Sequence, residues 1–252
     1  MKTGMALCEP CVWLLLLFCA MILFSAGCDK ASKSSVLIIT GGHGFERDAF
    51  FAMFDSYADV AYTEIEHPAA NDIYGSPDIN NYDVLVFYDM VQDINETQQQ
   101  QMLALLDQGK GMVFLHHSLV SYQQWDEFGK IIGGRYHLER EGSDITPSTY
   151  KHDVKLPVQI VDKKHPVTRG LENFVIHDEA YGGFTVRSDV RPLLTTTHED
   201  NGETIAWTNQ YKNARIVYLQ LGHDHFAYED ANYRKLVNQA IKWVQKNDGD
   251  TN

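Results

Sequence analysis

Four short apolar runs within about 80 residues constrain the fold of this chain more than any other feature. They span residues 36–40, 61–65, 84–88 and 111–115. The first is a continuous run of β-branched and apolar side chains, which a strand buried on both faces requires. Helix signals join three of the four predicted strands. The pattern therefore predicts an α/β chain with a doubly wound, mostly parallel sheet.

Apolar spacing places the helices between these strands. Asp48 is expected to cap a helix whose buried face repeats at i, i+3, i+4 and i+7. That face consists of Phe50, Met53, Phe54 and Tyr57. A second helix begins at Asn95 or Thr97. Later helices are predicted at 125–132 and 231–245, and later strands, mixed in direction, at 154–161, 191–196, 204–207 and 215–219. Residues 135–153 show little periodicity, which indicates a long functional loop.

The N-terminal segment has the pattern of an export signal. Lys2 precedes a 13-residue apolar run over 12–24, and small residues at 25–27 lead to Cys28. A run this short fits a signal peptide better than a membrane span. Small residues before a cysteine resemble a bacterial lipobox, so residues 1–28 are predicted to be a lipoprotein signal ending at a lipidated Cys28. The protein would then be exported and anchored to a membrane. A plain membrane anchor is the alternative.

Cysteine usage and charge exclude several classes of protein. All four cysteines lie in the leader, at positions 8, 11, 19 and 28, so the body has no disulfide framework, cysteine-based zinc site or catalytic cysteine. The formal charge of −13 argues against nucleic-acid binding. Residues 29–35 are expected to be a tether, 36–245 a single domain and 246–252 a polar tail. The 224 residues after the leader suffice for one α/β domain.

The chain's histidines fall into two groups by their position relative to the predicted strands. Ligands of open parallel sheets lie beyond the carboxyl ends of the strands. Five histidines have such positions or follow a glycine stop, and we expect them to converge: His43, His116, His117, His137 and His223. Four others are expected at the surface or in packing: His67, His152, His165 and His198. The glycine-rich loop at 41–44 either cradles an anion at a helix start or forms a tight turn.

Two short motifs carry the candidate chemistry. Successive strand residues point to opposite faces, so at most one of His116 and His117 enters the crevice while the chain stays extended. The triplet at 177–179 places Asp178 and Glu179 beside an imidazole, which is either an acid–base or metal-ligand set or a solvated loop. Tyr181 follows this triplet. Histidine and carboxylate together suit zinc or another first-row divalent ion. The candidate metal ligands are His116, His137, Glu179 and His223.

Taken together, the motifs resemble the ThuA-like (trehalose-utilisation) family over residues 36–245. The resemblance lies in residues 41–44, 114–117, 133–137, 165–167 and 178–181, in Trp207, and in 215–218 leading to 221–224. It implies a flavodoxin-like fold similar to class I glutamine amidotransferases. The amidotransferase cysteine is absent, because the fourth strand ends in His116 and His117. The resemblance also implies a link to the use of disaccharides, including oxidised (keto) sugars.

These observations lead to an expected function. With the resemblance, they imply that the domain binds and transforms a sugar or keto-sugar by hydrolysis, elimination or isomerisation. The expected catalytic residues are His116 with Asp178 or Glu179. The expected ligand-binding residues are His43, His117, His137, Tyr181, Trp207 and His223. Trp207 either stacks on a sugar ring or fills the core. A non-catalytic carbohydrate-binding or scaffold lipoprotein is the alternative function.

Overall fold

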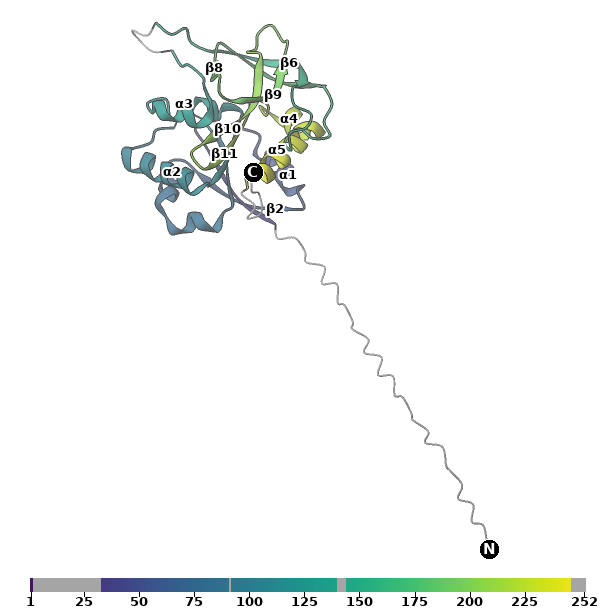
Figure 1. Cartoon of the computed structure of the whole chain (residues 1–252). Coiled ribbons are helices and arrows are strands. Elements are labelled where there is room, and N and C mark those ends of the chain that lie inside the picture. Colours follow the sequence, from purple (N-terminus) through teal and green to yellow (C-terminus); the bar gives the residue numbers. More distant parts are fainter. Residues whose placement is uncertain (2–32, 91, 140–143, 246–252) are drawn as a thin grey trace. The chain divides into compact units, whose positions relative to one another are not determined.

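A nine-stranded mixed sheet forms the centre of the computed structural model, which describes residues 1, 33–90, 92–139 and 144–245 (Figure 1). The predicted signal segment with Cys28, most of the tether and the polar tail lie outside the described residues. Among the residues that are described, no helix combines the length and apolar character needed to cross a membrane.

The sheet has a parallel half and an antiparallel half. In spatial order its strands are β2 (Val60–Glu66), β1 (Ser34–Gly41), β3 (Val84–Asp89), β4 (Gly111–Leu115), β11 (Ala214–Leu219), β10 (Thr204–Tyr211), β9 (Arg191–Thr196), β6 (Thr149–Ile160) and β7 (Phe174–Gly182). The strands from β2 to β11 pair in parallel, and those from β11 to β7 pair antiparallel. The parallel half has the flavodoxin-like strand order, so the predicted fold class is confirmed. Strands β5 (Gly134–Arg135) and β8 (Thr185–Val186) form a separate pair.

Helices cover both faces of the parallel half, because its strands bury alternate side chains in two cores. Val36 and Ile38 of β1 share one core with α1 (Arg47–Asp55) and α5 (Ala231–Val244). Leu37 and Ile39 share the other core with α2 (Glu96–Gln108) and α3 (Asp126–Ile132). Figure 1 shows α2 and α3 on one side of the sheet, and α1, α4 (His225–Glu229) and α5 on the other. This double covering explains the continuous apolar runs.

Local signals set several boundaries. Asn95 caps α2 in a capping box, accepting the backbone N–H of Gln98 at 3.0 Å while the Gln98 side chain accepts the N–H of Asn95 at 3.1 Å. The predicted cap at Asp48 is wrong. Helix α1 begins at Arg47, and Asp48 lies in its first turn. Single-turn and two-turn 3₁₀ segments also occur, at Ala69–Gly75, Pro77–Asn81 and His116–Val120.

The antiparallel half differs most from the prediction. Strand β6 begins at Thr149, inside the stretch expected to be a loop, and pairs along β7. Strand β7 contains the triplet at 177–179, so the solvated-loop alternative for Asp178 and Glu179 is wrong. Similarly, β1 begins at Ser34, within the predicted tether.

His165 is a packing residue, which was one of the two positions expected for it. Its side chain is buried, its ring centroid lies 4.9 Å from that of Trp243 on α5, and its Nδ1 accepts the N–H of Val167 at 3.2 Å. Burial, with a smaller contribution from Arg191, lowers the pKa of His165 from 6.5 to about 4.

We expect His165 to make the fold sensitive to acid between about pH 6.5 and pH 4. In this window the unfolded chain binds a proton that the folded chain excludes, so the free energy of unfolding falls as the pH falls. The expected loss is about 1–3 kcal/mol. Urea titrations across this range check it, comparing wild type with His165→Asn. Equal pH slopes in the two proteins would contradict the prediction.

Candidate functional site

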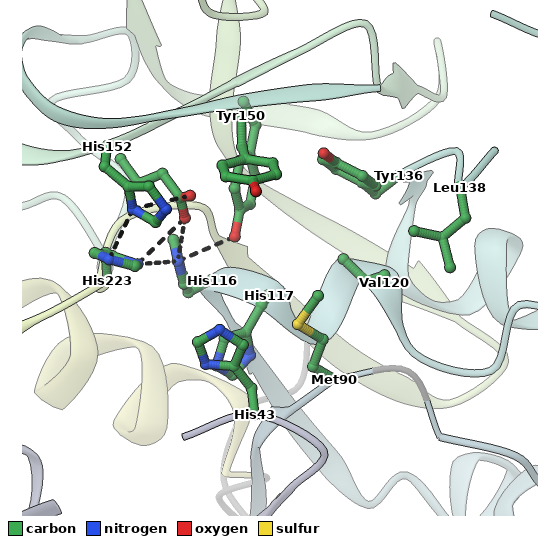
Figure 2. A pocket seen from close by; sticks show the side chains of 12 residues that line it. His43, Met90, His116, His117, Val120, Tyr136, Leu138, Tyr150, His152 and His223 are labelled. Carbon is green, nitrogen blue, oxygen red and sulfur yellow. Dashed lines mark hydrogen bonds and ion pairs between the residues drawn. The ribbon is translucent and has the colours of Figure 1, made fainter. Parts of the chain in front are cut away.

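A pocket of about 200 Å³ lies at the edge where the parallel strands end. Figure 2 shows its two unlike walls: His116, His152 and His223 gather on one side, and Met90, Val120 and Leu138 lie on the other. His43, His117, Tyr136, Tyr150, Glu179 and Tyr181 complete the lining. The pocket therefore presents one polar, titratable wall and one apolar wall.

The backbone turns sharply where β4 ends, and this turn brings both histidines of the pair into the pocket. Strand β4 ends at Leu115, and His116 has φ +49° at the start of a 3₁₀ segment. A positive φ is uncommon for a residue with a side chain. The strand alternation that would have separated the two rings no longer applies, and both His116 and His117 line the pocket.

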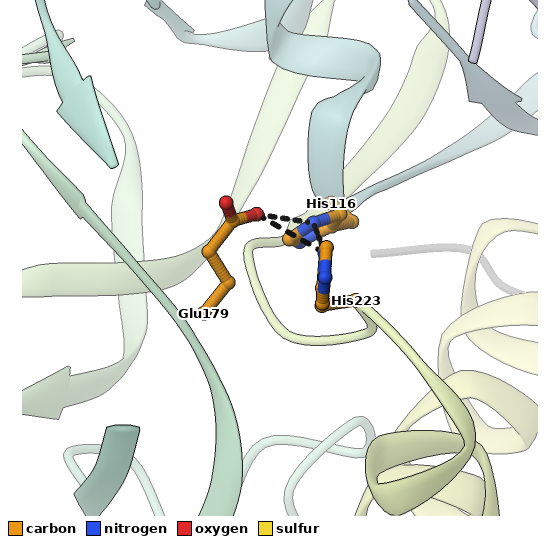
Figure 3. A group of neighbouring side chains, drawn as sticks. All are labelled: His116, Glu179 and His223. Atoms are coloured by element: carbon orange, nitrogen blue, oxygen red, sulfur yellow. Dashed lines mark hydrogen bonds and ion pairs between the residues drawn. The ribbon is translucent and has the colours of Figure 1, made fainter. Parts of the chain in front are cut away.

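Three side chains from three elements meet at the polar wall (Figure 3). Nε2 of His116 lies 2.9 Å from Oε2 of Glu179, and Nδ1 of His223 lies 3.3 Å from the same oxygen. The two ring nitrogens are 3.3 Å apart. His116 follows β4, Glu179 belongs to β7, and His223 follows β11. We call these three residues the His–Glu–His cluster.

Surrounding hydrogen bonds fix the ring of His116. Its Nδ1 lies 2.6 Å from the carbonyl oxygen of Gln220, which can only accept, so Nδ1 carries the proton. The hydroxyl of Tyr181 lies 3.0 Å from Nε2, and the two rings are stacked. His116 and Tyr181 are both buried. The imidazole consequently has one orientation and directs Nε2 at the Glu179 carboxylate.

The cluster shifts the acid–base behaviour of its members in opposite directions. Burial alone would raise the pKa of Glu179, but its contacts with His116 and His223 outweigh burial and hold that pKa well below its usual value. Contact with Glu179 raises the pKa of His223 against the opposing effect of burial. Burial, reinforced by His116 and His43, holds the pKa of His117 well below 6.5. Glu179 is thus a carboxylate and His117 a neutral ring at neutral pH.

Asp178, the other predicted acid–base candidate, does not line the pocket. Its Oδ2 accepts the N–H of Gly222 at 2.8 Å, and its Oδ1 accepts the N–H groups of His223 at 3.0 Å and Glu179 at 2.8 Å. Burial raises the pKa of Asp178. These bonds hold the loop that carries His223 beside β7, so Asp178 positions the cluster from behind.

The structure brings six of the predicted site residues to the pocket: His43, His116, His117, Glu179, Tyr181 and His223. His137 lies outside the lining, and its Nε2 is 3.2 Å from the hydroxyl of Thr185. Trp207 is fully buried, and its indole N–H donates to the carbonyl of Ile132 at 2.7 Å. Of its two predicted roles, this position matches the filling of the core.

Two pairs of glycines, Gly133–Gly134 and Gly41–Gly42, allow neighbouring parts of the chain to pack closely. A Cβ atom on Gly133 would lie 2.7 Å from Nε1 of Trp207, and one on Gly134 would lie 2.9 Å from the same indole. Gly42 has φ +83°, and a Cβ there would collide with the carbonyl oxygen of Met90. The loop at 41–44 therefore fits the tight-turn alternative, because the chain after β1 must pass close to the chain after β3.

His152 is the main site residue that the sequence did not reveal. Its side chain is half exposed, which agrees with the expected surface position, but it also lines the pocket. Its Nδ1 lies 3.0 Å from Nε2 of His223 and 3.4 Å from Oε1 of Glu179. Tyr150, two residues earlier on β6, also lines the pocket. The available signal was their alternation along one strand face, which the irregular sequence of 135–153 obscured.

Comparisons with known proteins agree with this fold. A family profile described as trehalose utilisation (ThuA) matches residues 35–244. A ThuA-like protein from Parabacteroides merdae superposes with a TM-score of 0.72 at 21% identity, covering 85% of this chain and 91% of that one. A ThuA-like protein from Bacteroides uniformis gives 0.66 at 21% identity, covering 88% and 95%.

The chain also resembles, more distantly, one part of a larger enzyme. Gan42B, a GH42 β-galactosidase from G. stearothermophilus, gives a TM-score of 0.54 at 12% identity, covering 84% of this chain but 30% of that one. At these identities the likenesses establish the fold alone. No curated protein sequence matches the chain.

Proposed function

Because the chain belongs to the trehalose-utilisation (ThuA) family, we propose that its pocket binds and transforms a sugar or keto-sugar. The observation that carries the proposal is the His–Glu–His cluster, built from three separate elements and open to a pocket with an apolar opposite wall. A sugar ring has polar edges and less polar faces, which suits a pocket of this kind.

The size of the pocket supports a ligand with one enclosed ring. Its volume of about 200 Å³ is below the roughly 300–1,000 Å³ typical of pockets for larger ligands. Tyr150 lines the pocket yet is 63% exposed, which places an aromatic ring at the mouth. Such a ring can pack against a sugar face while its hydroxyl stays in water. A disaccharide would then bind with one ring inside and the other near Tyr150.

The donor set favours proton transfer beside a carbonyl over hydrolysis by paired carboxylates. Glycoside hydrolysis commonly uses two carboxylates facing the substrate, and among the described residues lining the pocket Glu179 is the only carboxylate. In the proposed reaction a proton leaves the carbon next to the keto group, and its electron pair moves to the carbonyl oxygen. The cluster stabilises that oxygen, and the imidazole of His43, which also lines the pocket, takes the proton. Isomerisation or elimination follows from the resulting enolate.

Solvent exchange tests this proposal directly. Purified protein is incubated in deuterated water with disaccharides and with their keto forms, and NMR follows the carbon-bound protons. We expect deuterium to enter next to the keto group, and the parent sugars to remain unlabelled. Tight binding of a sugar without exchange or turnover would instead support the non-catalytic carbohydrate-binding alternative.

We also propose that the protein works outside the cytoplasm on a lipid anchor. The sequence supports this through the short apolar run at 12–24, the small residues before Cys28 and a body that lacks cysteine.

Cys28→Ala is expected to prevent both acylation and membrane association, because the thiol that would receive the lipid is absent. Metabolic labelling with a fatty acid, followed by membrane fractionation, measures both effects. Lys33→Ala, a change in the segment just after the anchor, serves as the control and should keep the label. Label retained in the Cys28 variant would contradict the lipoprotein proposal.

A further inference from the structure

We propose that the His–Glu–His cluster binds one divalent first-row transition-metal ion through Nε2 of His116, Oε2 of Glu179 and Nδ1 of His223. The inference deepens the proposed function, on which it rests for the role of the pocket. The binding itself stands on the geometry of the three side chains. Their ligand atoms all lie within 4.8 Å of one another, and two of the three residues are buried.

The three separations match those around a metal ion. The ligand atoms are 2.9, 3.3 and 3.3 Å apart. With bonds of about 2.1 Å, neighbouring ligands lie about 3.4 Å apart in a tetrahedral site and about 3.0 Å apart in an octahedral one. The cluster already has this spacing, so an ion can enter without rearranging the strands that hold it.

In the absence of a cation, two hydrogen-bond acceptors of the cluster, a ring nitrogen of His116 and the carboxylate of Glu179, lie next to each other. Nδ1 of His116 donates to the carbonyl of Gln220, so the neutral ring has its lone pair on Nε2. That lone pair lies 2.9 Å from the carboxylate oxygen of Glu179, with both side chains buried. The hydroxyl of Tyr181 lies 3.0 Å from Nε2, but its single O–H can donate to only one of the two acceptors. A metal ion removes this repulsion. A proton on Nε2 would remove it too, and this is the competing arrangement.

A second layer of contacts orients the ligands as metal sites require. Histidine ligands commonly donate their other ring N–H to a carbonyl, carboxylate or water. His116 does so to Gln220. Nε2 of His223 lies 3.0 Å from Nδ1 of His152, which can accept its proton and leave Nδ1 of His223 free for the ion. Asp178 holds the His223 backbone in place.

The ligand types indicate the class of ion. Two imidazoles and one carboxylate suit zinc and its first-row neighbours, whereas magnesium and calcium prefer oxygen ligands. Three protein ligands with an open position are typical of catalytic sites and differ from closed structural ones. Because the cluster lines the pocket, an oxygen atom of the bound sugar can occupy the open position on the ion.

Metal titration of the full-length chain in detergent, after treatment with a chelator and with the leader thiols blocked by N-ethylmaleimide, tests the proposal. Calorimetry with Zn²⁺ and visible absorption with Co²⁺ should both show one site. Glu179→Gln and His223→Asn should each weaken binding by more than about 100-fold, because a direct ligand is lost. His152→Asn should weaken it by about 10–100-fold, as expected for a residue that orients a ligand.

A matched histidine control is available at His225. Its Nδ1 lies 2.8 Å from Oε2 of Glu46, a pair that resembles the cluster but lies outside the pocket. His225→Gln should keep wild-type metal affinity. Circular dichroism and melting curves verify that each variant is folded, and the two separate ligand variants guard against one that is not.

The proposal is overturned if wild type binds no tighter than Glu179→Gln and His223→Asn, in which case a proton occupies the cluster. The exchange assay with keto-sugar, run on chelator-treated and metal-loaded protein, separates this failure from that of the proposed function. Exchange that persists without metal, in a protein that binds no ion in the titration, overturns the metal proposal and leaves the sugar chemistry. A protein that binds metal but shows no exchange keeps the metal proposal and contradicts the proposed sugar chemistry.

Discussion

Glu179→Gln is expected to lower the rate of exchange or turnover of a keto-sugar by about 100-fold or more. The substitution keeps the size of the side chain and removes its charge. The carboxylate contacts both imidazoles of the cluster, at 2.9 and 3.3 Å, so its loss alters the centre that stabilises the carbonyl oxygen. We expect a stability loss of only about 1–2 kcal/mol, because the new amide can still donate to Nε2 of His116.

Glu127→Gln provides the matched control. Glu127 also has a lowered pKa, caused mainly by Lys130, and its carboxylate accepts from Lys130 and Tyr211 at 2.7 Å each. It lies outside the pocket. The control should lose a similar amount of stability, measured by urea unfolding, and keep its activity. Equal activity in the two variants would show that Glu179 has no part in the chemistry.

Trp207→Ala is expected to destabilise the fold by about 3–5 kcal/mol. The indole is fully buried in the core between the sheet and α3, its ring centroid lies 4.4 Å from that of Tyr218, and its N–H donates to Ile132. Truncation leaves a cavity and an unpaired carbonyl group. Urea unfolding measures the loss.

Trp207→Phe separates the two parts of this effect. It keeps an aromatic ring and loses the hydrogen bond to Ile132, so the expected cost is smaller, about 1–3 kcal/mol. Neither variant should change sugar affinity at temperatures where it is folded. A Trp207→Ala protein that keeps its stability but loses sugar binding would restore the sugar-stacking role predicted from the sequence.

The parallel half of the fold could be predicted because its signals are local. The buried strands are continuous apolar runs, and Asn95 with Gln98 marks the start of α2. Strand β7 gave no such signal, because charged residues at 177–179 interrupt its apolar pattern. Its burial depends on pairing with β6, which no local sequence window shows.

The site was harder to predict than the fold for a related reason. Strand ends located His116 and His223 near the same edge, since parallel strands share a direction. The choice between Asp178 and Glu179 depended on which way each carboxylate points along β7. His152 depended on where β6 begins. Both facts follow from long-range pairing in the antiparallel half, so the sequence alone could not supply them.

The left-handed turn at His116 has a consequence for how related chains could change their chemistry. A residue with a side chain at φ +49° is held there by its surroundings, at a cost of the order of 1–3 kcal/mol. The backbone at this point is therefore set by the scaffold around it, and the side chain of residue 116 is presented to the crevice whatever its identity. Such a position fixes where the reactive group lies and leaves its chemical identity open to substitution. A single codon change there exchanges one reactive group for another, imidazole for thiol or hydroxyl, while the strands and helices stay as they are.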